Sequence, residues 1–506
     1  MAGIGFELKR LFAHKGLIAT ARAYGYAAMV CAGPMLLGFV LLLSIMLLAE
    51  WAGAGRTDRE LMVSMVTYAL LSSLVLTSLF SMLTTRYMAD MIYEKKYTRI
   101  MPSFYGSLGI MLVIGAVGYG IFLHFAGIPL SYQIMSFMLF MTLIVVWTEI
   151  NYLTAIKDYK NIMLAFATAV VASFLLGIIF IWLFHIPTVI ALMSAICIGY
   201  GIMMVWYFLL IYRYFPEGFG TSVKFFEAFD QTPQLSFIGF FITLGLFGHL
   251  IIMWASRVGV QVQGLFYGAP MYDVAAIFAF FSILITTINF VTSAEVRFYP
   301  RYREYFSLFN DGGSIENIDE AEHNMVRVMS EELGYLAQKQ LLSTLLFIIL
   351  GTIILPQLPL GFTNEMLSVF RVLCVGYGFY AIGNSIMLIS QYFADFKGAM
   401  IDASVFVVVS NLATILLMNG SSAFYGFGFV LGGALFCLVA WIRLCQYLNK
   451  LKYNILSKQP MLVVTHVGIL TRIARALEPR AIRKQSRRNE VYFEKNEGES
   501  VNETAK

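Results

Sequence analysis

Twelve long apolar runs constrain the fold of this 506-residue chain more than any other feature. Each approaches or exceeds the roughly 20 residues that an α-helix needs to cross about 30 Å of hydrocarbon. Hydrophobic residues make up 59% of the chain and charged residues only 13%, well below the quarter or so that is usual in soluble domains. The sequence therefore predicts an all-α integral membrane protein with twelve transmembrane helices. The predicted spans cover residues 24–48, 62–84, 103–126, 132–154, 162–184, 188–212, 235–255, 271–293, 339–357, 367–392, 399–418 and 425–446.

The distribution of Lys and Arg predicts how these helices are oriented. With both termini in the cytoplasm, 31 of the 35 basic residues fall on the cytoplasmic side. Only Arg56, Arg59 and Arg257 fall in outer loops, and Arg371 lies within the tenth run. Basic residues concentrate in the cytoplasmic loops of membrane proteins, so this alternation supports twelve spans with both termini cytoplasmic. The net charge of +5 therefore reflects orientation and does not indicate nucleic-acid binding.

The even number of spans predicts two halves that share one orientation. Two sets of six helices that both begin in the cytoplasm form a parallel repeat, related by an axis along the membrane normal. A short echo fits this repeat, because Asp158-Tyr159-Lys160-Asn161 follows the fourth run and Asp395-Phe396-Lys397-Gly398 follows the tenth. The predicted domains are an amphipathic N-terminal segment (1–23), a first six-helix bundle (24–212), a cytoplasmic linker (213–234), a second six-helix bundle (235–447) and a basic cytoplasmic tail with a disordered end (448–506).

Two cytoplasmic segments show the spacing of amphipathic helices. In the N-terminal segment the apolar residues recur on one face, at Ile4, Leu8, Leu11 and Phe12. In the inner loop before the ninth run, the sequence predicts a helix over 314–338, in which Asn317-x-x-Glu320 resembles a capping box. The apolar stripe of this helix includes Met325, Val328, Met329 and Leu333. A stripe of this kind either lies on the membrane surface or docks a cytoplasmic partner, and both interpretations stay open.

The sequence contains no combination of residues that we can defend as a catalytic or metal site. The six histidines are scattered singly, without the spacing of metal ligands. No G-x-x-x-x-G-K-[ST] sequence is present, which excludes a P-loop nucleotide site. All five cysteines lie in apolar segments without a CxxC pair. We therefore expect a transport protein that is not an enzyme and holds no cofactor or metal.

Polar residues inside the spans are the candidates for a transport path, because polar groups are costly in a membrane and default to functional roles. Tyr377, Tyr380 and Asn384 share one helix face in the tenth run, and Asn411 lies mid-way along the eleventh. The charged candidates lie near span ends, at Glu149, Arg371 and Asp402. The other interpretations are hydrogen bonding between helices for the first group and snorkelling or interfacial ion pairs for the second. Because the mid-membrane region is almost free of charge, a neutral cargo rich in hydroxyl groups fits best.

Several stretches resemble a known family. MAGIGFELKR and AYGYAAMVCAGP near the N-terminus, RFYPRYREYF before Gly312-Gly313, and AFYGFGFVL in the last run are similar to the PelG family of Pel exopolysaccharide transporters. The likeness covers about 1–455, and the opening motif is its most specific part. The resemblance implies two six-helix bundles of the multidrug and oligosaccharidyl-lipid flippase superfamily (a MATE-like fold) that alternate access around a central cavity. It identifies no residue as an established ligand.

The resemblance also implies a function and partners. The implied function is export of a hexosamine-rich exopolysaccharide across the bacterial inner membrane. The implied partners are a cytoplasmic glycosyltransferase and a cyclic-di-GMP-responsive membrane subunit, which would form a biofilm synthesis complex with this protein. Membrane lipids are the other expected partner, and nucleic acid is not expected. Two other functions stay open. One is a cation-coupled antiporter or flippase for small molecules or lipid-linked oligosaccharides, and the other is a membrane scaffold for the glycosyltransferase.

Overall fold

The computed structural model describes residues 17–156, 158–216, 218, 220–310, 312–358, 361–457 and 468–477. Apart from one small hairpin and the connecting loops, these residues are helical, as the sequence predicts. The predicted N-terminal amphipathic stripe lies outside the described residues. Eleven helices of the described part are long and apolar enough to cross a membrane, and they coincide with the predicted spans from the second onward. The first predicted span falls in α2, whose qualifying apolar stretch is the shorter Leu36–Trp51, so the count of twelve and the orientation stay predictions.

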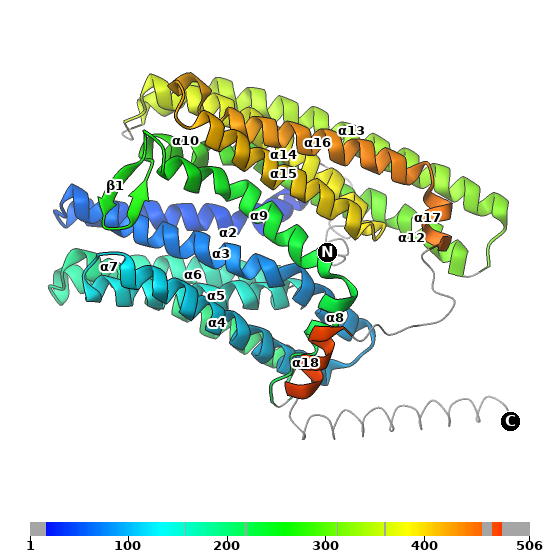
Figure 1. Ribbon diagram of the computed structural model, residues 1–506, viewed down its shortest axis with the longest axis horizontal. Helices are drawn as coiled ribbons and strands as arrows, with labels where there is room; N and C mark the ends of the chain where they lie inside the picture. The colour runs from blue at the N-terminus through cyan, green and yellow to red at the C-terminus, as the bar shows by residue number, and fades with distance from the viewer. Residues whose placement is uncertain are drawn as a thin grey trace.

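The chain forms two helical layers, which Figure 1 shows one above the other. The first half contains α2 (Leu17–Trp51), α3 (Arg56–Tyr93), α4 (Ile100–Phe125), α5 (Leu130–Ile156), α6 (Tyr159–Ile178) and α7 (Thr188–Tyr214). The second half contains α9 (Pro233–Trp254), α10 (Pro270–Phe280), α11 (Leu284–Ser293), α13 (Ile315–Ile354), α14 (Asn364–Tyr392), α15 (Phe396–Leu417) and α16 (Phe427–Leu448). The shorter elements are α8 (Phe225–Gln231), β1 (Val260–Gln263), β2 (Phe266–Gly268), α12 (Tyr299–Asn310), α17 (Leu451–Ser457) and α18 (Ile469–Leu477).

The packing within the two halves supports the predicted repeat, because each main helix pair of the first half has its counterpart in the second. The pairs α5–α7 and α6–α7 correspond to α14–α16 and α15–α16. The pair α2–α6 corresponds to α9–α15, and α3–α5 corresponds to α10–α14. The pair α4–α5 likewise corresponds to α13–α14. A parallel two-fold repeat of six spans produces this correspondence.

The echo between Asp158 and Asp395 has a structural cause. Asp158 is the N-cap of α6, and its side chain accepts a hydrogen bond from the backbone N–H of Asn161. Asp395 is the N-cap of α15 and accepts from the backbone N–H of Gly398. A carboxylate at this position satisfies an N–H group that the first helical turn leaves without a partner. The two motifs therefore begin equivalent helices of the two halves.

The two bundles contact each other through two helix pairs, α3–α9 and α2–α11. The two-fold repeat maps one pair onto the other, because α2 corresponds to α9 and α3 corresponds to α10 and α11. On the first contact, Gly239 of α9 packs closely against α3, because a Cβ atom there would lie 2.6 Å from the carbonyl oxygen of Ser78. On the second side, Phe39 of α2 packs edge-on against Phe278 and Phe281, with ring centroids 5.8 and 5.2 Å apart. The bundles therefore touch through small residues and aromatic edges.

A third contact between the bundles lies at the end of the molecule predicted to face outward. The loop after α9 forms an antiparallel hairpin of β1 and β2, at the left of Figure 1. The Tyr68 hydroxyl of α3 donates to the Tyr267 carbonyl and accepts from the Tyr267 N–H, both at 3.1 Å. The Tyr68 ring stacks on Trp254, with centroids 4.7 Å apart. Phe266 is fully buried in the core of the first bundle. We call these residues (Tyr68, Trp254, Phe266 and Tyr267) the outer clasp.

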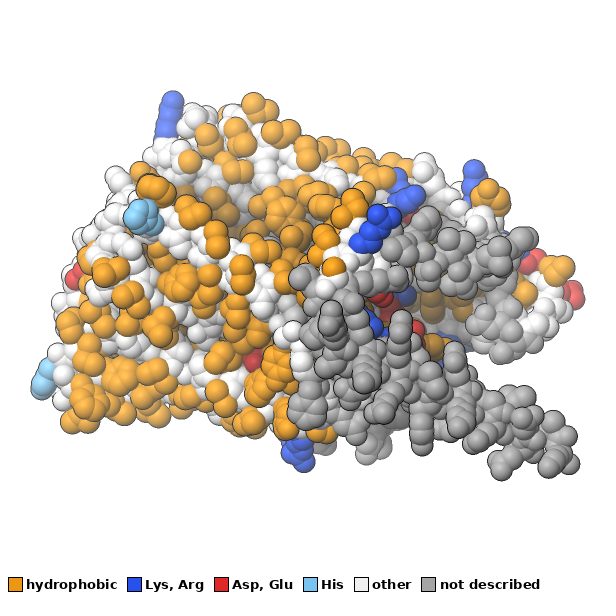
Figure 2. Space-filling view, turned by 60° about the horizontal axis from the view of Figure 1, so that its bottom comes forward, with side chains coloured by type: hydrophobic (Ala, Val, Ile, Leu, Met, Phe, Trp, Pro, Cys, Tyr) orange, Lys and Arg blue, Asp and Glu red, His pale blue; other side chains and the backbone are white. Residues whose placement is uncertain are grey.

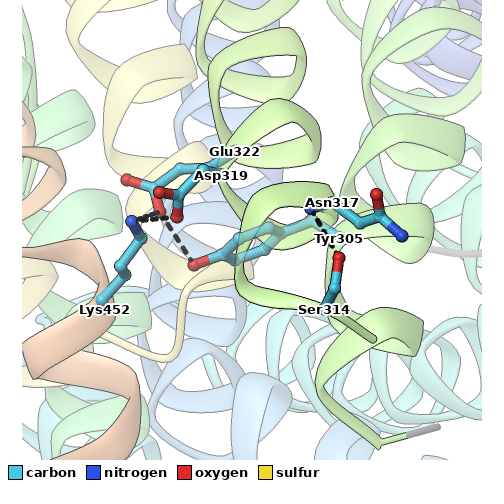
Figure 3. Close-up of polar contacts among 6 residues, drawn as sticks. All are labelled: Tyr305, Ser314, Asn317, Asp319, Glu322 and Lys452. Carbon is cyan, nitrogen blue, oxygen red and sulfur yellow. Dashed lines mark hydrogen bonds and ion pairs between the residues drawn. The ribbon is translucent and has the colours of Figure 1, made fainter. Parts of the chain in front are cut away.

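The opposite end of the molecule carries an arm of two packed helices, α12 and the first half of α13. The second of these begins after Ser314, whose hydroxyl accepts from the Asn317 N–H, so the predicted cap at Asn317 is wrong by three residues. Figure 3 shows how α17 reaches this arm. The Lys452 ammonium bonds Asp319 and lies 3.7 Å from Glu322, which also accepts from the Tyr305 hydroxyl at 3.3 Å. The bond to Asp319 is the main cause that raises the pKa of Lys452 above its ordinary value.

The tail of the chain returns to the first half at this same end. The Asp230 carboxylate of α8 accepts two hydrogen bonds of 2.6 Å, from the backbone N–H and the hydroxyl of Thr471 in α18. In Figure 2, hydrophobic side chains are spread widely over the described surface, and most visible charged side chains gather toward one end. The rest of the tail lies outside the described residues.

Candidate functional site

The predicted polar patch of the tenth span lies in the packed interior of the second bundle. Tyr377 is 3% exposed, with the rings of Phe280 and Phe429 at centroid distances of 5.3 and 4.7 Å. Tyr380 is also buried and stacks on Phe406 at 5.3 Å. Both residues therefore contribute to helix packing in this conformation. The third member, Asn384, is half-buried on the same helix.

Asn411 of α15 contacts α9 inside the same bundle. A Cβ atom on Gly248 would lie 2.5 Å from the Asn411 Oδ1, so the amide fills the space that this glycine leaves. The Asn411 Oδ1 is buried and has no hydrogen-bond partner among the described residues. An amide oxygen without a partner inside a bundle is energetically costly, and the role of Asn411 in a transport path stays a prediction.

The structure does not bring the three charged candidates together. Glu149 is 1% exposed in the first bundle, and its Oε2 has no hydrogen-bond partner among the described residues. Asp402 is buried in α15, and the Arg443 guanidinium of α16 lies 3.6 Å away. Arg371 is exposed, and its Nε donates to the Thr352 hydroxyl at 3.1 Å. In this conformation they occupy three separate places in the molecule.

A buried histidine was missed as a site residue by the sequence reasoning. His249 of α9 is fully buried, and its Nδ1 lies 2.8 Å from the Tyr272 hydroxyl of α10. Its Nε2 has no partner among the described residues. The signal available in the sequence was an isolated histidine within an apolar run, and only the packing of α9 against α10 supplies its partner.

A polar pocket, open on one side, lies between α11 and α13. Its volume is about 250 Å³. One wall comes from α11 and the π-helical turn that follows it, Ala294–Phe298, and the other wall comes from α13. The polar side chains that face it are Asn289, Thr292, Ser293, Arg297, Glu332, Tyr335 and Lys339. None of these residues is predicted from the sequence as part of a site, because the two walls are separated by about 40 positions in the chain.

Interactions within the pocket fix the position of its charged groups. The Arg297 guanidinium donates to one oxygen of Glu332 at 2.6 Å, and the Ser293 hydroxyl donates to the other. The Lys339 ammonium donates to the Asn289 amide oxygen at 3.0 Å and lies 5.0 Å from the centre of the Tyr335 ring. Groups held in this way by their neighbours are preorganised for a ligand.

A hydrogen-bonded seam continues from the pocket along α11 and α13. The fully buried Gln340 accepts from the Thr286 hydroxyl and donates to Thr344 at 2.9 Å. The Ser343 hydroxyl donates to the carbonyl of Ser282 at 2.9 Å. Because these polar groups satisfy one another inside the bundle, they hold the two walls of the pocket in one register.

The predicted docking stripe on α13 is covered by the chain itself. Met325, Met329 and Leu333 are buried against α12, α14, α16 and α17, and Val328 is half-buried. The stripe therefore stabilises the arm in this structure. Docking of a cytoplasmic partner on this stripe stays a prediction.

The chain is similar to a known protein family and to several solved structures. Residues 1–456 match the family described as PelG, "Putative exopolysaccharide Exporter (EPS-E)". A search of curated protein sequences gave no significant match. Among solved structures, a MATE in the bent conformation has a TM-score of 0.60 at 13% identity, covering 89% of this chain and 98% of its own. A point mutant of a MATE has a TM-score of 0.56 at 13% identity, covering 85% of this chain and 96% of its own.

A third solved structure has the same fold. It is an outward-facing multidrug resistance MATE family transporter of the MOP superfamily, with a TM-score of 0.53 at 15% identity, covering 84% of this chain and 96% of its own. At these identities the likeness establishes the fold. The spanning helices make the chain a multi-pass membrane protein, and its exporter family places it in the inner membrane. The chain therefore belongs to the PelG family of exopolysaccharide exporters and is a membrane transporter with the MATE fold.

Proposed function

We propose that this protein exports a hexosamine-rich exopolysaccharide by letting the polymer pass between its two bundles as they rock against each other. The observation that carries the proposal is the way the bundles meet. The bundles contact each other through the helix pairs α3–α9 and α2–α11, which the two-fold repeat relates, and through the outer clasp. Surfaces joined by small residues and a few hydrogen bonds can separate and close again as rigid bodies.

The proposed partners follow from the same function. A polymer that leaves the cell as it is made needs a cytoplasmic glycosyltransferase beside its exporter, and the family resemblance implies a cyclic-di-GMP-responsive membrane subunit as well. The arm formed by α12 and α13 extends from the end of the molecule that is predicted to be cytoplasmic. We assign this arm as the place where the complex assembles.

The test is a deletion strain complemented with matched glycine variants. Gly239→Leu inserts a side chain between the bundles, where even a Cβ atom would lie 2.6 Å from α3. Gly118→Leu adds the same side chain on α4, where nothing lies within 4 Å of a Cβ atom. We expect the deletion and Gly239→Leu to abolish extracellular polymer, with polymer synthesis machinery still present, and Gly118→Leu to export normally.

Three outcomes separate the alternatives. Normal export in the deletion strain refutes the exporter function. Normal export by Gly239→Leu, at a normal amount of membrane protein and with the glycosyltransferase still in the membrane of the deletion strain, refutes rocking between the bundles while keeping the exporter. If Gly239→Leu exports normally and the deletion strain also loses the glycosyltransferase from its membrane, the protein is a scaffold instead.

One observation favours a cation-coupled transporter of the same fold as the second candidate. Glu149 and Asp402 are buried, and neither carboxylate has all its oxygens hydrogen-bonded among the described residues. Buried acids of this kind can take up a proton or a cation. A Glu149→Gln and Asp402→Asn double variant that loses resistance to small toxic cations, but exports polymer normally, supports that alternative.

A further inference from the structure

The pocket between α11 and α13 combines the groups that recognise a sugar ring. A sugar presents hydroxyl groups, which both donate and accept hydrogen bonds, around a ring with apolar C–H faces. The Glu332 carboxylate and the Asn289 amide oxygen supply acceptors, while Arg297 and Lys339 supply donors. The Tyr335 ring is 58% exposed at the rim, where a sugar face can pack on it.

The charges of the pocket leave its lining net positive. Arg297 is paired with the Glu332 carboxylate, whereas Lys339 bonds the neutral Asn289 amide and keeps its charge. This excess charge disfavours a cationic, deacetylated sugar unit relative to a neutral, N-acetylated one. A sugar hydroxyl can also donate to the Glu332 carboxylate, which is 17% exposed, whereas a phosphate oxygen cannot.

The size and place of the pocket limit the ligand to one unit of a longer chain. About 250 Å³ equals the space of roughly eight water molecules, which suits a single ring with its substituents. The pocket is open on one side, so neighbouring units of a polymer can continue out of it. It lies at the C-terminal end of α11, the end that the basic residues predict to be cytoplasmic, and α11 is one of the helices through which the two bundles meet.

The backbone around the pocket is irregular where the ligand would lie. The π-helical turn Ala294–Phe298 interrupts the helix that forms one wall, directly after Ser293. Single π-turns inside helices occur often at functional sites, because the wider turn re-aims the side chains beside it. Ser293 and Arg297, four positions apart, both bond the Glu332 side chain, so the π-turn lies directly beside the polar wall.

We propose that this pocket is a sugar-binding subsite that holds one neutral hexosamine unit of the polymer at the inner entrance of the transport path. The assignment rests on the exporter function proposed above and adds the place where the chain is first held. Glu332 and Asn289 bind ring hydroxyls, Tyr335 packs on the ring, and Arg297 positions the Glu332 carboxylate.

The experiment uses the full chain, purified in lipid nanodiscs, and a tetramer of N-acetylglucosamine as the probe. Affinity is measured by isothermal titration. We expect Tyr335→Ala and Glu332→Gln each to weaken binding by about tenfold or more, since each removes one direct contact. Tyr335→Phe retains the ring and should bind nearly as the unaltered protein does.

Glu331→Gln is the matched control, because Glu331 is the exposed neighbour of Glu332 and does not line the pocket. Its binding should be unchanged. Thermal unfolding of every variant shows whether a loss of binding reflects loss of the fold. Asn289→Ala provides a second variant that leaves the Arg297–Glu332 pair intact and should also weaken binding.

Two results overturn the assignment. One is that the tetramer does not bind the unaltered protein, or binds the pocket variants as tightly as Glu331→Gln. The other concerns chemical labelling of Lys339 in nanodiscs without sugar. If Lys339 is protected in phosphatidylglycerol nanodiscs but not in phosphatidylcholine nanodiscs, and no sugar binds, the pocket is a lipid headgroup site. If either holds while the deletion strain still fails to export polymer, the subsite is wrong and the exporter function stands.

Discussion

The outer clasp yields the sharpest prediction about how the bundles move. The Tyr68 hydroxyl makes two hydrogen bonds across the interface, to the Tyr267 carbonyl and from the Tyr267 N–H, each at 3.1 Å. Tyr68→Phe removes both and keeps the ring that stacks on Trp254. At about 0.5–1.5 kcal/mol for each bond, the closed outer end loses roughly 1–3 kcal/mol relative to the open one.

That loss corresponds to a shift of about 5- to 150-fold in the closed-to-open ratio. If the closed state starts near 99%, a tenfold shift raises the open state to about 9%. The assay places spin labels at Arg56→Cys and Arg257→Cys, two exposed outer-loop positions on different bundles, in a cysteine-free background. Pulsed electron resonance then measures the distance distribution between them, and we expect Tyr68→Phe to add a longer-distance population.

Tyr119→Phe is the matched control for this measurement. It makes the same chemical change but removes a 2.8 Å hydrogen bond to Ser136, which lies within the first bundle. Both variants should lower the thermal stability somewhat, and only Tyr68→Phe should open the outer end. An unchanged distance distribution in Tyr68→Phe, or an equal change in Tyr119→Phe, refutes the reasoning that the clasp holds the bundles closed.

Three further predictions concern the ends of helices. Asp230→Ala removes both hydrogen bonds to α18, so the amide exchange rate of residues 469–477 should rise at least tenfold while exchange in the spans stays unchanged. An exchange rate in α18 equal to that of the unaltered protein contradicts this docking. Asp158→Ala and Asp395→Ala should each lower unfolding stability by about 1 kcal/mol and by similar amounts, and a large inequality argues against equivalent caps. Lys452→Met should change stability only slightly, because its ion pairs are exposed. Since the pKa of Lys452 is raised, any contribution of its ion pairs to the free energy of unfolding is present at neutral pH and is lost as the pH rises through that pKa. A large loss of stability in Lys452→Met that persists at high salt contradicts a weak, exposed ion pair.

Much of the fold could be predicted from the sequence because membrane helices follow local composition. In the part of the chain that the structure describes, the eleven helices of spanning length appear where apolar runs of about 20 residues occur, since a helix in lipid must be long and apolar whatever its neighbours are. The Asp158 and Asp395 motifs marked the repeat because an N-cap is encoded within four residues. Local chemistry of this kind survives in any tertiary context.

The pocket and the clasp could not be predicted, because each joins residues that are far apart in the chain. Tyr68 and Tyr267 are 199 positions apart, and Tyr68 reads as an ordinary interfacial aromatic residue in an apolar run. Glu332 reads as part of a solvated helix face, and only the packing of α13 against α11 brings it to Ser293. Tyr377 and Tyr380 were placed on one helix face correctly, yet sequence alone could not tell that this face lies in a packed interior.

The burial of Phe266 has a consequence for how the protein is made. This residue belongs to the second half of the chain and completes the core of the first bundle. Domains generally fold in the order in which the ribosome delivers them. The six helices of the first half are synthesised before residue 266 exists. The core of the first bundle therefore lacks the Phe266 side chain when these helices enter the membrane. Its final packing waits for the hairpin, and insertion of the second half is thereby coupled to maturation of the first.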